Sequence, residues 1–128
     1  MRYAFIGGTL RGLELLKALI KNNFIPLKAI VLKEDDHEEN ISNEIITYLN
    51  QHRVENRCCK KVLSEDYIQL QTLSLDFVFV CGWRTIIDVK LNRYLKLGMF
   101  AAHDSLLPLY RGFAPLNWAI INGEKETG

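Results

Sequence analysis

The chain alternates between short apolar runs and longer segments in which apolar residues recur every three or four positions. An apolar run at 3–8, YAFIGG, is followed by a helical stripe in TLRGLELLKALIKNN at 9–23. Thr9 is the predicted N-cap of this helix. The next apolar run, PLKAIVLK at 26–33, predicts a buried strand.

The alternation continues to the end of the chain and predicts an α/β fold. Strands that alternate with helices indicate a Rossmann-like, mainly parallel sheet flanked by helices. The strongest predicted strand is DFVFVCGW at 76–83, which is apolar on both faces. Further helices are expected at 43–52, 64–75, 88–95 and 114–124, and further strands at 53–58 and 99–103.

Three of the predicted strands end in unusual residues. They are Gly-Gly-Thr at 7–9, Cys-Gly-Trp-Arg at 81–84 and His-Asp-Ser-Leu-Leu-Pro at 103–108. Ligands of parallel sheets bind beyond the carboxyl ends of the strands. We therefore expect these three stretches to meet at one crevice.

Composition excludes some classes of protein. A chain of 128 residues that is 48% hydrophobic fits one globular domain. The net charge of +1 provides no strong field for nucleic acid or for a cationic partner. No apolar segment reaches the roughly 18 residues that span a bilayer, so no membrane contact is expected. Three cysteines without a C-x-x-C spacing indicate reduced thiols and a cytoplasmic protein.

Short motifs suggest other chemistries that fit less well. Thr9 interrupts the G-x-G-x-x-G pattern of nicotinamide-cofactor sites, which leaves a tight turn as the simpler interpretation. The acidic run at 33–40 lacks the spacing of metal ligands and is interpreted as a solvated loop, so no metal is expected. His103 and Ser105 lack the G-x-S-x-G elbow of a serine hydrolase.

The segment from Gly98 to Gly128 carries a specific pattern. It reads GMFAAHDSLLPLYRGFAPLNWAIINGEKETG and resembles the signature of the 10-formyltetrahydrofolate-dependent formyltransferases, N-x-H-x-S-L-L-P-x-[YW]-R-G-x-x-P. The resemblance extends back to residue 76 through DFVFVCGWRTII. The stretches YRGFAP and APLNW look closest to members that formylate amino sugars on nucleotide carriers. Methionyl-tRNA formyltransferases share the core motif, so a tRNA partner stays open.

The resemblance implies a reaction and a set of site residues. A formyl group would pass from 10-formyltetrahydrofolate to a primary amine, with His103 as base and then acid. The folate would lie against the loop after the strong strand and against the turn that follows the histidine. The implied folate contacts are Thr85, Ile86, Ile87, Ser105, Leu106, Leu107, Pro108 and Phe113. Arg84 is interpreted as a solvated cation.

Two departures from the family pattern affect the expected activity. Ala101 occupies the position of the family asparagine, whose amide stabilises the oxyanion, and a methyl group donates no hydrogen bond. The family also has a catalytic aspartate a few tens of residues beyond the histidine. We therefore expect residues 1–128 to be the N-terminal part of a catalytic domain. A catalytically impaired or ligand-binding fragment is the alternative, and a homo-oligomer stays open.

Overall fold

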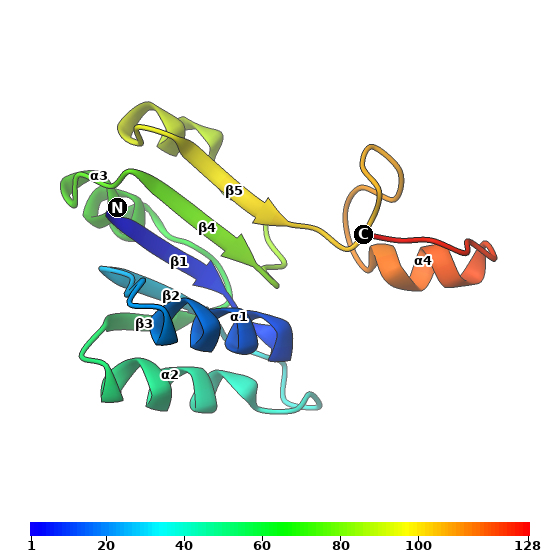
Figure 1. Cartoon of the computed structure of the whole chain (residues 1–128), viewed down its shortest axis with the longest axis horizontal. Coiled ribbons are helices and arrows are strands. Elements are labelled where there is room, and N and C mark those ends of the chain that lie inside the picture. Colours follow the sequence, from blue (N-terminus) through cyan, green and yellow to red (C-terminus); the bar gives the residue numbers. More distant parts are fainter.

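The computed structural model describes all 128 residues, and its centre is a parallel sheet of five strands (Figure 1). The strands follow the order β3-β2-β1-β4-β5 across the sheet. Their bounds are β1 (Tyr3–Gly7), β2 (Lys28–Leu32), β3 (Glu55–Cys59), β4 (Phe77–Cys81) and β5 (Gly98–Ala102). The helices are α1 (Thr9–Lys21), α2 (Ile41–Gln51), α3 (Ser64–Thr72), the 3-10 helix η1 (Val89–Tyr94) and α4 (Pro115–Ile121).

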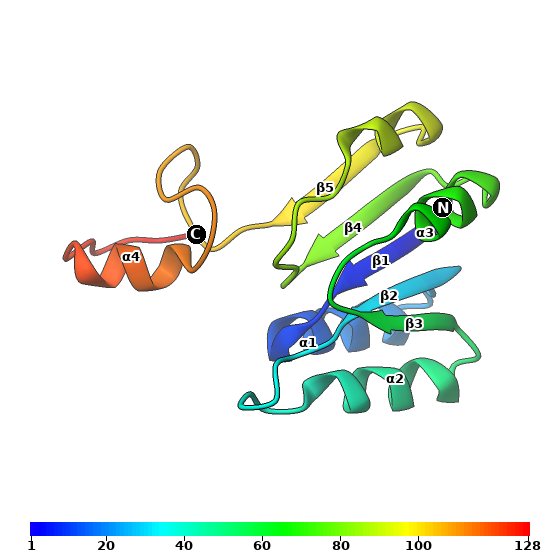
Figure 2. The same cartoon turned by 180° about the vertical axis from the view of Figure 1, so that it is seen from behind.

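Helices cover both faces of the sheet, as the predicted Rossmann-like class requires. Successive residues of β1 point to opposite faces, so Tyr3 and Phe5 join one apolar cluster while Ala4 and Ile6 join another. The first cluster lies under α1 and α2, and the second under α3 and η1 (Figures 1 and 2). The two clusters form the core of the chain.

The order of the strands places three strand ends side by side. The chain moves outward from β1 to β3 and then returns to pair β4 with the free side of β1. Gly7 pairs with Cys81, and Cys81 pairs with Ala102. The predicted meeting of the three strand ends is confirmed.

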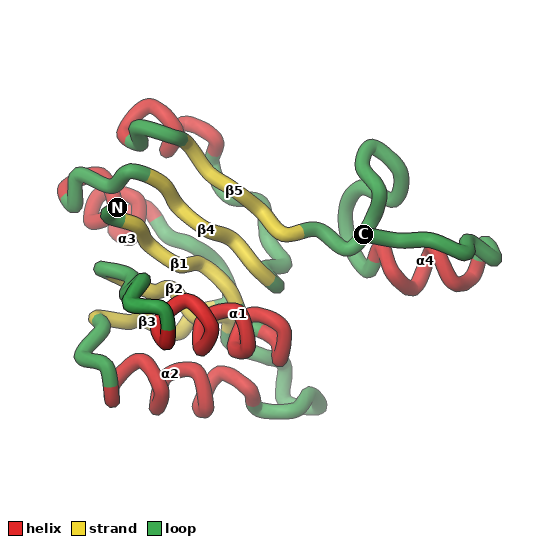
Figure 3. Tube along the Cα trace, in the orientation of Figure 1, coloured by secondary structure: helices red, strands yellow, loops and turns green.

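The residues after β5 leave the sheet as an arm, defined here as residues 103–128. Figure 3 shows a long loop after β5 that leads to α4, which stands beyond the tips of the strands. Within α4 only Ala119 is buried, whereas Trp118 and Ile120 are exposed. The arm therefore packs mostly against itself.

Some predicted boundaries are corrected by the structure. The N-cap of α1 is Gly8, not Thr9, and Thr9 has a positive φ of 64° at the first helical position. The helix expected at 88–95 is a 3-10 helix, in which the Asp88 side chain accepts a hydrogen bond from the Lys90 N–H. No helix is both long and apolar enough to cross a membrane.

Candidate active site

An open cavity of about 580 Å³ lies where the carboxyl ends of β1, β4 and β5 meet. It has three walls: the first turn of α1, the loop after β4, and two segments of the arm, at 103–104 and 112–115. The lining residues are Thr9, Leu10, Arg11, Cys81, Gly82, Trp83, Arg84, Thr85, Ile86, Ala102, His103, Asp104, Gly112, Phe113, Ala114 and Pro115.

Glycines allow the backbones of β1 and β4 to approach closely at the floor of this cavity. The Gly8 N–H donates to the Cys81 carbonyl at 3.0 Å. A Cβ on Gly7 would lie 2.2 Å from the same oxygen, so no larger residue fits there without a shift of the backbone. Gly82 has a φ of +67°, a conformation that glycine adopts without strain. The Gly-Gly pair is therefore a packing requirement of this turn.

His103 follows β5 directly and lies half-buried at the edge of the cavity. Its Nε2 lies 3.2 Å from the Tyr110 carbonyl oxygen. A carbonyl only accepts, so this contact assigns the ring proton to Nε2 and leaves the lone pair on Nδ1. The geometry therefore gives His103 one ring nitrogen that is able to accept a proton.

The two residues after His103 do not orient its ring. Asp104 forms an ion pair with Arg11 of α1. Ser105 is buried, and its hydroxyl donates to the Leu109 carbonyl at 2.6 Å. This hydroxyl is committed to the backbone of its own loop, which argues against a nucleophilic serine.

The loop after His103 is braced by the end of the chain. The Tyr110 hydroxyl donates to Glu124 at 2.7 Å, and this hydrogen bond is the main cause of a raised pKa of Tyr110. The Thr127 hydroxyl donates to the Asp104 carbonyl at 2.9 Å. These contacts fix the Tyr110 carbonyl that receives the His103 hydrogen bond.

The structure brings together only some of the residues implied as folate contacts. Thr85, Ile86 and Phe113 line the cavity with His103, and 92% of the surface of Ile86 is exposed. Ile87 instead packs against the core cluster below α3. The turn from Ser105 to Pro108 also lies off the cavity: Ser105 is buried, Leu107 and Pro108 are exposed, and Leu106 lines a second cavity of about 380 Å³.

Ala101 lies in β5 opposite Val80, and its small side chain is exposed. The neighbouring Ala102 lines the cavity, whereas Ala101 does not. Neither methyl group donates a hydrogen bond. The two residues before His103 therefore provide no side-chain hydrogen-bond donor.

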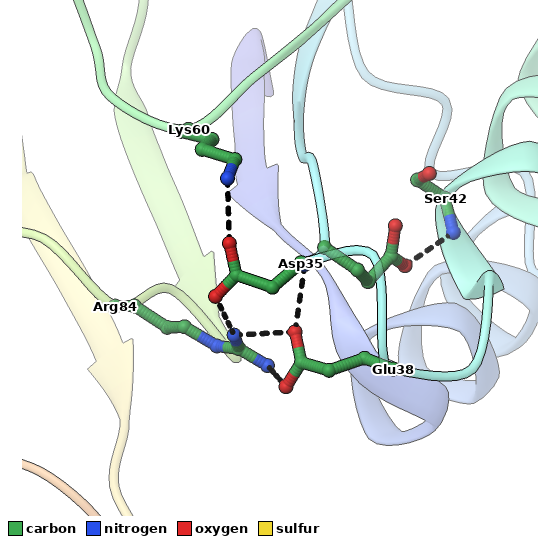
Figure 4. Close-up of polar contacts among 6 residues, drawn as sticks. Asp35, Glu38, Ser42, Lys60 and Arg84 are labelled. Carbon is green, nitrogen blue, oxygen red and sulfur yellow. Dashed lines mark hydrogen bonds and ion pairs between the residues drawn. The ribbon is translucent and has the colours of Figure 1, made fainter.

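Sequence reasoning missed the partner of Arg84, which is exposed as expected but is also paired with Glu38. Its guanidinium donates from two nitrogens to the two carboxylate oxygens of Glu38, at 2.6 and 2.7 Å (Figure 4). These bonds, followed by the Asp35 N–H, lower the pKa of Glu38 to about 2. No local signal joins the two residues, because they lie 46 positions apart.

Other candidate chemistry in the chain is limited. No group of three or more His, Cys, Asp or Glu side chains is arranged to hold a metal ion. Cys81 lies buried at the cavity floor, where burial raises the pKa of its thiol. A protonated thiol is a weak nucleophile, so Cys81 is a packing residue in this geometry.

Known proteins are similar to this chain in sequence and in fold. The chain is 36% identical over 115 residues to the bifunctional polymyxin resistance protein ArnA of Wigglesworthia glossinidia brevipalpis, covering 88% of this chain and 18% of that protein. It is 32% identical over 133 residues to a methionyl-tRNA formyltransferase of Bacteroides fragilis, covering 100% of this chain and 40% of that protein. The chain thus spans less than half the length of these relatives.

A solved structure and a family model agree with these relatives. The phosphoribosylglycinamide formyltransferase of Bacillus halodurans superposes with a TM-score of 0.74 at 20% identity, covering all of this chain and 69% of that one. This similarity supports the fold. The Formyl transferase family model matches residues 1–128. The chain therefore belongs to the formyl transferase family.

Proposed function

We propose that this chain carries the donor site and the proton-transfer histidine of a 10-formyltetrahydrofolate-dependent N-formyltransferase. The acceptor is the primary amine of a nucleotide-linked amino sugar. The observation that carries the proposal is the position of His103, at the edge of a cavity where β1, β4 and β5 end. Ligands of parallel sheets bind at such a reversal of strand order.

The dimensions and lining of the cavity support a folate donor. Its volume of about 580 Å³ lies within the range of roughly 300–1,000 Å³ that is typical of small-molecule sites. Ile86 and Phe113 offer apolar surface to a flat ring, and Thr85 lines the same cavity. The donor supplies the formyl carbon, and these residues would hold it beside His103.

His103 supplies the proton transfers that the reaction needs. Its Nδ1 takes the proton that the amine loses as the amine nitrogen bonds to the formyl carbon. The ring then returns a proton to N10 of the folate as the bond between the formyl carbon and N10 breaks. One proton thus moves from amine to folate, and no oxidant or reductant is required. Histidine suits both steps because its ordinary pKa lies near neutral pH.

The acceptor is the part of the proposal that has an alternative. The stretches YRGFAP and APLNW resemble those of formyltransferases acting on nucleotide-linked amino sugars. Methionyl-tRNA is the second candidate, because relatives named methionyl-tRNA formyltransferase align over the whole chain at 31 to 32% identity. A product assay with both amines separates the two candidates.

The test combines donor binding with turnover. Calorimetry with a folate analogue is expected to detect binding, and 10-formyltetrahydrofolate is expected to formylate a nucleotide-linked amino sugar. His103→Gln is expected to reduce turnover by about 10²- to 10⁴-fold while donor affinity changes little. His52→Gln is the matched control, because His52 caps α2 far from the cavity. Absence of folate binding would overturn the proposal, and formylation of methionyl-tRNA alone would overturn the choice of acceptor.

A further inference from the structure

Charged side chains connect the loops that follow β2, β3 and β4 (Figure 4). Glu38 receives two hydrogen bonds from Arg84, and its Oε2 also accepts the Asp35 N–H at 2.9 Å. Asp35 in turn accepts a hydrogen bond from Lys60 at 2.5 Å. Of these residues, Arg84 is the one that lines the cavity.

We propose that Glu38 is a positioning residue for the donor side of this cavity: it holds Arg84, and thereby orders the loop after β4 (residues 82–88). The role of the loop as a donor wall rests on the proposed function. The fixing of the loop by Glu38 stands on the contacts alone.

The pair is built to restrict movement. A guanidinium that uses two nitrogens on two carboxylate oxygens is fixed in plane and direction, unlike a single contact from lysine. Glu38 is itself anchored, because its own loop donates the Asp35 N–H to it. The Glu38 carboxylate is therefore held in place whether or not Arg84 is bonded to it.

The loop has few other attachments near Arg84. Thr85 and Ile86 are exposed. Trp83 packs against the core cluster below α3, and its indole N–H donates to Thr85 within the same loop. At the far end, the Asp88 N–H donates to the Tyr67 hydroxyl at 2.9 Å. Beside the apolar packing of Trp83, Arg84 thus provides the side-chain hydrogen bonds that tie the first half of the loop to the rest of the molecule.

Loss of the pair between Arg84 and Glu38 should change the order of the loop and the affinity for the donor more than the free energy of unfolding. The side chains of Arg84 and Glu38 retain 32% and 27% exposure, and ion pairs with this access to solvent contribute little to unfolding free energy. The loop residues that pack against the core, Trp83 and Ile87, are unchanged in such variants. A variant that breaks the pair should therefore remain folded.

The experiment measures amide hydrogen exchange and folate binding in three variants. Glu38→Gln is expected to speed exchange at residues 83–87 without ligand and to raise the Kd of a folate analogue about fivefold, as when one fifth of molecules hold a competent loop. Arg84→Lys keeps the charge but loses the planar contact, so an intermediate effect is expected. Asp36→Asn is the matched control, because it removes a charge from the same loop and Asp36 forms no ion pair.

Distinct results overturn each idea. Unchanged exchange at 83–87 in Glu38→Gln would overturn the positioning role, as would equal effects of Asp36→Asn. Tighter folate binding by Glu38→Gln would show that a freed Arg84 binds the ligand directly and would also overturn the role. If the unsubstituted chain binds no folate analogue, the proposed function fails, while the ligand-free exchange still decides whether Glu38 orders the loop.

Discussion

At position 101 a methyl group stands where related formyltransferases are expected to carry an amide. Ala101 lies two positions before His103 and just outside the lining of the cavity, which begins at Ala102. A larger polar side chain would have room at this exposed position of β5. Position 101 therefore allows a donor to be introduced without disturbing the core.

Restoring the amide should raise turnover. Ala101→Asn is expected to increase kcat by about 10²- to 10³-fold, because a preorganised donor would stabilise the developing oxyanion. Steady-state formylation measures the effect, and Ala101→Leu is the control of similar volume that has no donor. A rate in Ala101→Asn no higher than in Ala101→Leu would show that another group already stabilises the oxyanion.

Single residues were predictable where their position follows from a strand end. The end of β4 places Thr85 at the cavity, and the end of β5 places His103 there. Ser105 was not predictable, because its hydroxyl turns back to the Leu109 carbonyl and pulls the turn away from the cavity. The pairing of Arg84 with Glu38 depends on the approach of two loops, which local sequence does not encode.

Among the elements, β1 and α1 contact the end of β4 through glycines, and this close contact depends on the absence of a side chain. A Cβ on Gly7 would meet the Cys81 carbonyl at 2.2 Å, and one on Gly12 would meet it at 3.2 Å. The first contact is with rigid backbone in the centre of the sheet. The second is tight, but it lies in a helix where alanine is favoured over glycine.

Alanine substitutions at these two positions should have different effects. Gly7→Ala is expected to destabilise the chain by about 1–3 kcal/mol or to prevent folding, because the β1 and β4 backbones must separate. Gly12→Ala is expected to stay within about 1 kcal/mol, since the gain in helix propensity offsets the close contact. Urea unfolding measures both, and equal midpoints for the two variants would contradict this account.

The helices and strands were predicted better than the burial of their side chains. Apolar runs located β1 and β2, which are buried on both faces, and also β4. The polar and partly exposed β3 was located by its place in the alternation of strands and helices. Apolar periodicity also located α4, where Pro115 begins the helix. It did not reveal that Trp118 and Ile120 are exposed, because a pattern of apolar residues does not specify what covers them.

At the scale of the whole molecule, the structure consists of a packed sheet domain and a loosely attached arm. Arg11 and Asp104 form the ion pair that joins α1 to the beginning of the arm. The arm's remaining side-chain hydrogen bonds, such as Tyr110 to Glu124, lie within it. The position of His103 relative to the sheet thus depends on β5 and on this ion pair.

Breaking that ion pair should loosen the arm alone. Arg11→Gln is expected to speed hydrogen exchange a few-fold at residues 103–112, with no change in β1 or β4, because local opening follows local contacts. Lys21→Gln, at the other end of α1, is the control. Faster exchange throughout the sheet would instead show that Arg11 supports the whole domain.

The central position of β1 has a consequence for how the chain folds. β1 pairs on one side with β2 and on the other with β4, and the Arg2 N–H donates to Asp76 across 74 positions. Closing so long a loop costs chain entropy before the pairing returns any energy, which slows folding. During synthesis on the ribosome, the side of β1 that pairs with β4 therefore stays unpaired until Cys81 has emerged.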